Sequence, residues 1–95
     1  MNKFRLYVSK KCPKNLALSK LLENVFDDLT GGIFEFEVFS LLENADMATR
    51  DGVLITPTLI KSHPEPPQRF IGNLNNPKIV KKLIIEKRLD PNCPG

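Results

Sequence analysis

The sequence has few of the residues that metal centres, disulfide frameworks and membrane spans require. Its 95 residues contain no tryptophan, one tyrosine, one histidine and two cysteines, Cys12 and Cys93, whose separation matches neither a disulfide framework nor a zinc site. No apolar run approaches the roughly 18 residues of a membrane span, and the first residues lack the apolar core of a signal peptide. These shortages exclude a metal centre and a membrane span, so we expect a cytoplasmic protein without metal or cofactor.

What is present is the composition of one small globular domain. Hydrophobic residues make up 41% of the chain and charged residues 26%, which is typical of folded proteins. We expect a single domain over residues 1–95, with residues 90–95 as a loose tail. Because so short a chain buries only a thin core, we also expect it to form a homo-oligomer, either a dimer or a tetramer.

The charges are arranged in blocks within a net charge of +3. Residues 1–20 carry only cations, residues 21–65 are mainly acidic, and residues 66–95 are again mainly basic. Such blocks can steer a partner or align protomers, or they can be solvated faces of neighbouring elements. The last basic block has no interleaved aromatic residue for base stacking, so we expect no nucleic-acid partner.

Residue spacing predicts three elements in the first half of the chain. Residues 3–9 alternate apolar and polar side chains, which indicates a strand. Residues 15–29 repeat apolar side chains every three or four positions, which indicates an amphipathic helix with Pro13 in its first turn and Gly31 at its end. Residues 33–39 alternate again and predict a second strand.

The second half predicts a short helix over residues 43–51 and a strand over residues 53–61, interrupted at Pro57 because proline cannot donate to a ladder. A proline-rich loop over residues 62–67, a very short strand at residues 68–71 and a helix from Asn76 follow. The buried stripe expected on that last helix is Ile79, Val80, Leu83 and Ile84. The order β-α-β-α-β-β-α predicts an α/β protein with a thioredoxin-like fold.

Four stretches, in this order, resemble the KaiB circadian clock protein family. They are Arg5-Leu6-Tyr7-Val8; the helix with Ala17, Leu18, Leu21 and Leu22; Val53-Leu54-Ile55-Thr56-Pro57-Thr58-Leu59-Ile60-Lys61; and Pro67-Gln68-Arg69-Phe70-Ile71-Gly72-Asn73-Leu74. The resemblance extends over about residues 3–89. It departs from the family at the cationic loop around Cys12, at Ser40, Gly52 and Asn73, and in the tail.

The resemblance implies a non-enzymatic protein without catalytic residues, which binds the hexameric RecA-like ATPase KaiC. In cyanobacteria such proteins help to sequester KaiA; elsewhere they accompany KaiC-like ATPases and are linked to stress adaptation. It also implies switching between a self-associating ground-state fold and a thioredoxin-like fold, and leaves open which of the two the free protein adopts. Lys61 and Arg69 match family positions near the partner-binding edge, so we expect them to bind the partner. Lys3 and Arg5 on the first strand are further candidates.

A different hypothesis rests on Cys12, between the first strand and the first helix. A thiol at a helix N-terminus near Lys10, Lys11 and Lys14 favours the thiolate, but Asn15 stands where a resolving cysteine would be. The hypothesis is therefore a monothiol redox or oxidative-stress protein, and the alternative is a neutral replacement.

Prolines provide a possible switch. Pro57 is a candidate cis-proline, and slow isomerisation at Pro57, Pro64, Pro66 or Pro67 could slow a change of fold; the alternative is a rigid turn. His63, the only histidine, is expected on a surface loop.

Overall fold

The computed structural model describes residues 2–63, 66–71, 74 and 76–89, and the side chains of residues 83 and 85–89 lie outside this description. Seven elements follow one another in the predicted order. They are β1 (Asn2–Val8), α1 (Pro13–Thr30), β2 (Phe34–Ser40), α2 (Ala45–Arg50), β3 (Thr58–His63), β4 (Gln68–Ile71) and α3 (Pro77–Leu89).

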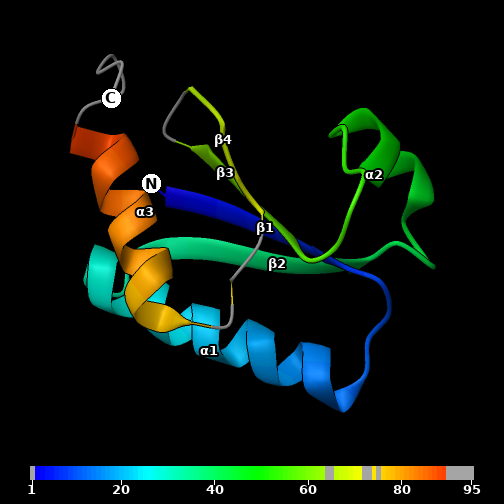
Figure 1. The fold of residues 1–95 in the computed structure, drawn as a ribbon, viewed down its shortest axis with the longest axis horizontal. Coiled ribbons are helices and arrows are strands. Elements are labelled where there is room, and N and C mark those ends of the chain that lie inside the picture. The colour runs from blue at the N-terminus through cyan, green and yellow to red at the C-terminus, as the bar shows by residue number, and fades with distance from the viewer. Residues whose placement is uncertain (1, 64–65, 72–73, 75, 90–95) are drawn as a thin grey trace.

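The four strands form one mixed sheet in the order β2-β1-β3-β4. β1 and β2 run parallel, whereas β1–β3 and β3–β4 pair in the antiparallel sense. α1 and α3 cover one face of the sheet, and α2 lies at the far end of β1 (Figure 1). We call the face opposite α1 and α3 the open face.

The main core lies between the sheet and the two helices α1 and α3. Alternation along β1 points Phe4, Leu6 and Val8 toward these helices, where all three are buried. The Phe4 ring stacks on Phe26 of α1 at a centroid distance of 3.8 Å, and Phe36 of β2 meets Phe26 edge-on at 5.0 Å. The first half of the chain therefore folds as its spacing predicts.

The second half departs from the predicted boundaries in two places. β3 begins at Thr58 rather than at residue 53, because Pro57 has no amide for a ladder. The Thr56–Pro57 peptide bond is cis. β3 also continues to His63, which pairs with Lys3 across a bulge. The prediction of a loop at Ser62 and His63 is therefore wrong, since pairing with β1 extends the strand.

The predicted stripe of α3 is correct at Val80 and Ile84, which are 1% and 4% exposed, but wrong at Ile79, which is 37% exposed. A single helix stripe faces the core, and Ile79 lies at its margin. Leu83 has no described side chain, and the predicted tail over residues 90–95 lies outside the described residues.

Candidate functional site

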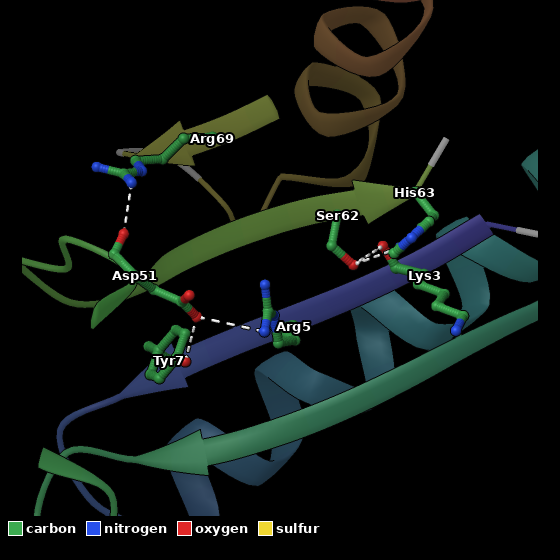
Figure 2. A network of polar contacts seen from close by, with 7 residues as sticks. All are labelled: Lys3, Arg5, Tyr7, Asp51, Ser62, His63 and Arg69. Carbon is green, nitrogen blue, oxygen red and sulfur yellow. Dashed lines mark hydrogen bonds and ion pairs between the residues drawn. The ribbon is translucent and has the colours of Figure 1, made fainter. Parts of the chain in front are cut away.

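Three of the four cations predicted to bind a partner lie on the open face of the sheet. Lys3 and Arg5 project from β1, and Arg69 projects from β4 (Figure 2). Arg5 pairs with Ile60 of β3, which pairs in turn with Arg69. Because directly paired residues share a face of the sheet, Arg5 and Arg69 belong to one row across it.

Asp51, directly after α2, connects this row to Tyr7. Its carboxylate accepts a hydrogen bond from the Tyr7 hydroxyl and lies 3.6 Å from the Arg5 guanidinium. Arg69 donates from Nη2 to the Asp51 carbonyl oxygen and from Nη1 to the Gly52 carbonyl oxygen, the latter at 3.1 Å. We call Arg5, Tyr7, Asp51, Gly52 and Arg69 the clasp, because they tie the end of α2 to two strands, β1 and β4.

The pKa of the Tyr7 hydroxyl is raised from 10.0 to about 12, and burial of the side chain within the clasp is the largest cause. The hydrogen bond to Asp51 and the negative charge of that carboxylate contribute in the same direction, while Arg5 and Arg50 oppose them in part. Each effect has the expected sign, because burial and a neighbouring anion both disfavour the phenolate. Tyr7 is therefore a neutral donor at physiological pH.

Glycine at position 52 suits the clasp for two reasons. Its φ of +70° is a left-handed conformation that side chains rarely adopt. A Cβ placed there would lie 3.3 Å from Nη2 of Arg69. The absence of a side chain at Gly52 therefore leaves room for the Arg69 guanidinium close to the backbone.

Lys3 forms an exposed ion pair on the open face. Its ammonium lies 3.7 Å from the carboxylate of Glu35 on β2, and both side chains are about half exposed, at 45% and 55%. Its carbonyl oxygen accepts a weak hydrogen bond from the Ser62 hydroxyl at 3.4 Å. An exposed pair of this length contributes little to stability, so Lys3 can exchange Glu35 for a partner's carboxylate.

Lys61 does not join the other three cations. It is only 5% exposed, because alternation along β3 places it with Leu59 on the face that α1 and α3 cover. Lys61 and Arg69 therefore lie on opposite faces of the sheet in this conformation, and the expectation that Lys61 binds the partner stays a prediction. The alternation of residues 58–61 already predicts that Lys61 shares a face with Leu59, whereas the resemblance alone suggested Lys61 as a binding residue.

Sequence reasoning missed the clasp and the apolar residues beside it. Leu54 and Ile55 follow Gly52 and are 94% and 52% exposed. Ile71 of β4, 49% exposed, pairs with Thr58, whose hydroxyl donates to the Ile55 carbonyl oxygen at 2.5 Å. We call Leu54, Ile55 and Ile71 the apolar strip. The position of Leu54 and Ile55 just before Pro57, where a strand cannot yet pair, could have indicated that they are exposed.

Cys12 lies elsewhere, at the N-cap of α1, with a half-buried side chain and no disulfide among the described residues. It lines a pocket of about 640 Å³ to which Pro57 also contributes. Pro66 and Pro67 are exposed and do not line this pocket. Pro64, like Cys93, is outside the described residues.

Neither a metal-ligand cluster nor a membrane-spanning helix is found in the described residues. No cluster of three or more potential metal ligands occurs among them. No helix within them has both the length and the apolar character that crossing a bilayer requires.

A family model described as the KaiB domain matches residues 5–85, so the chain belongs to the KaiB domain family. The circadian clock oscillator protein KaiB of Thermostichus vulcanus is 36% identical over 72 residues, which are 76% of this chain and 67% of that protein. The circadian clock oscillator protein KaiB1 of a Synechocystis strain is 33% identical over 72 residues, 76% of this chain and 69% of that one.

Solved structures confirm the fold class. A thioredoxin of Trypanosoma brucei brucei superposes with a TM-score of 0.68 at 15% identity, covering 95% of this chain and 77% of that one. The N-terminal domain of Synechococcus elongatus SasA gives a TM-score of 0.64 at 12% identity, covering 99% and 89%. The chain thus has an α/β thioredoxin-like fold, as its order of elements predicts.

Proposed function

We propose that this protein of the KaiB family is a non-enzymatic regulator that binds a KaiC-like RecA-type ATPase. The setting would be a circadian-clock-derived or a stress-adaptation system. Membership in the KaiB domain family supports the proposal, and so do the relatives named as clock oscillator proteins. The protein acts through differential affinity: because it prefers one state of the ATPase, its binding shifts the ATPase toward that state.

The observation that carries the proposal is the combination of cations and apolar side chains around the clasp. Arg69 holds the turn at Asp51 and Gly52, and the exposed Leu54 and Ile55 come directly after that turn. Apolar residues bordered by charged ones are the usual anatomy of a protein interface. Arg69 then acts as a positioning residue, while Lys3 and the apolar strip meet the partner.

The test is size-exclusion chromatography with light scattering on the protein alone and mixed with the KaiC-like ATPase of its host plus nucleotide. We expect co-elution near a six-to-six complex. The run on the protein alone also measures the predicted homo-oligomer. Separate elution under every nucleotide condition would contradict the proposal.

Charge reversal then tests the face. The variant Lys3→Glu with Arg69→Glu should lose the complex, because it removes a surface cation and releases the turn that carries Leu54. The matched control is Lys11→Glu with Lys20→Glu, which makes the same charge change at two exposed positions away from the open face. Loss of binding by both variants, or by neither, would contradict the assignment of this face. Circular dichroism checks that each variant is folded.

A second candidate function, monothiol redox chemistry, is favoured by the position of Cys12 at the N-terminus of α1 in a pocket shared with Pro57. It requires a thiol that alkylates faster than a free cysteine and an activity that Cys12→Ser abolishes. Iodoacetamide kinetics in a Cys93→Ser background measure the first requirement. A thiol that alkylates at the ordinary rate would exclude this candidate.

A further inference from the structure

The pocket beside α1 is separate from the open face. It lies between the loop that follows β1, the first turns of α1 and the Thr56–Pro57 bond, and no residue of the clasp lines it. Its volume of about 640 Å³ is within the range of small-molecule sites, roughly 300–1,000 Å³.

The floor of the pocket is apolar. Val8 and Leu74, which are 1% and 2% exposed, form part of it. Leu18 and Leu21, both half-buried on α1, and Pro57 extend it. A ligand that filled this space would gain free energy by removing an apolar body from water.

The charge around the pocket has one sign. Lys10 and Lys14 line it, and no aspartate or glutamate is among the described lining residues. The Asn15 side-chain amide donates to the Lys10 carbonyl oxygen at 2.7 Å, which ties the loop to the helix. The first turn of α1 contains no acidic residue, so its positive helix end adds to the two ammonium groups.

We propose that this pocket binds a small organic anion, namely a carboxylate, sulfonate or phosphate group attached to an apolar body. The acidic group pairs with Lys10 and Lys14 at the mouth, and the apolar body rests on Leu18, Leu21 and Pro57. Such a site is independent of the ATPase-binding proposal. A partner and a small anion could therefore bind the same molecule at two places.

The test uses two fluorescent probes that share an aromatic body. 8-Anilinonaphthalene-1-sulfonate carries a sulfonate, and N-phenyl-1-naphthylamine lacks it. We expect one anionic probe to bind per chain, with the neutral probe binding on the order of tenfold more weakly, because only the anion meets the two lysines. Equal binding of the two probes, or no binding of the anion, would overturn the proposal.

Variants locate the site. Lys10→Glu with Lys14→Glu should lower the affinity for the anionic probe by about tenfold and leave the affinity for the neutral probe unchanged. Lys20→Glu, exposed on α1 but outside the lining, is the control and should change neither. Ala17→Phe should reduce binding of both probes by filling the space at a lining position. Circular dichroism verifies the folding of each variant.

Cys12 supplies an independent report on location. In a Cys93→Ser background, saturating anionic probe should slow alkylation of Cys12 by the neutral reagent iodoacetamide at least severalfold, because Cys12 lines the pocket. Alkylation at the same rate with and without bound probe would mean that the probe sits elsewhere, and this too would overturn the proposal.

Discussion

The two faces of the sheet are held by different forces. On the covered face, Phe4, Phe26 and Phe36 form an aromatic cluster under α1, and burial of apolar area stabilises it. On the open face only Tyr7, Ala48 and Ile60 form a buried apolar cluster among the described residues, and directional hydrogen bonds of the clasp hold α2 in place. Stability thus comes mainly from the covered face, and the open face is the one that we propose meets a partner.

This difference matters because the two forces tolerate change differently. Apolar packing accepts rearrangement as long as volume is kept. A hydrogen-bond network fails when one partner is removed, because a buried polar group is left unsatisfied. We therefore expect substitutions on the covered face to lower stability most, and substitutions in the clasp to change the open face at a smaller cost.

The largest effect is expected for Phe26→Ala. Phe26 is fully buried and contacts the rings of Phe4 and Phe36, so its removal should cost about 3–5 kcal/mol of unfolding free energy. Urea denaturation measures the loss, and Phe26→Leu, which keeps much of the volume, should cost clearly less. A loss below about 1 kcal/mol for the alanine variant would contradict the importance of this core.

Tyr7→Phe should cost about 1–3 kcal/mol near neutral pH, because the Asp51 carboxylate loses its hydroxyl donor within the clasp. Its pH dependence is a sharper test. The folded-state pKa of about 12 exceeds the ordinary value of 10.0, so the folded protein holds a proton that the unfolded chain releases above pH 10. The stability due to this proton is complete below pH 10 and is lost as pH rises toward 12.

The size of that alkaline loss is about 2–3 kcal/mol. Tyr7→Phe lacks the titrating group and should lose correspondingly less stability between pH 10 and 12. Urea denaturation of both proteins across this range isolates the effect, because the lysines titrate in each. Parallel curves for the two proteins would show that Tyr7 titrates normally.

Gly52→Ala should cost about 1–2 kcal/mol, and more than Gly31→Ala. Both glycines have a left-handed φ, +70° and +66°, and a Cβ at Gly31 meets nothing within 4 Å. Backbone strain is therefore similar at the two sites, about 1 kcal/mol, whereas at Gly52 the nearest atoms belong to Arg69. In an Arg69→Ala background the difference between the two glycines should disappear, and its persistence would exclude the guanidinium as its cause.

The smallest effect is expected at the exposed ion pair between Lys81 of α3 and Asp28 of α1, at 2.9 Å. Its coupling energy should be about 0–0.5 kcal/mol and should fall with added salt. A double-mutant cycle with Lys81→Ala and Asp28→Ala measures it. A coupling above about 1 kcal/mol would show that the packing of α3 on α1 depends on charge more than the core suggests.

Residue spacing was a good guide wherever one local pattern acted alone. Alternation in β1 and β2 and the helical spacing of α1 gave elements, faces and core residues nearly as observed. From Gly52 onward the predicted boundaries were less accurate. Pro57 moves the start of β3 to Thr58, and pairing with β1 extends β3 to His63. Neither effect is visible in a window of a few residues.

Only part of the candidate site was predicted, because local pattern does not show which distant residues meet. Lys3 and Arg5 were identified by their place on the first strand and Arg69 by resemblance, and the fold brings the three to one face. Lys61 was selected on the same ground, yet its position in the alternation of β3 buries it. Asp51 was not identified at all, because a single carboxylate after a short helix has no distinctive spacing.

The sequence by itself determined the order of the elements, the residues of the aromatic core and membership in the KaiB domain family, because local periodicity and short motifs encode each of these. Only the tertiary structure decided that Asp51 meets Tyr7 and Arg69, partners 44 and 18 positions away in the chain. It likewise decided that Cys12 and Pro57 line one pocket. Such contacts depend on strand register and on the placement of α2, which become fixed only when the whole sheet assembles.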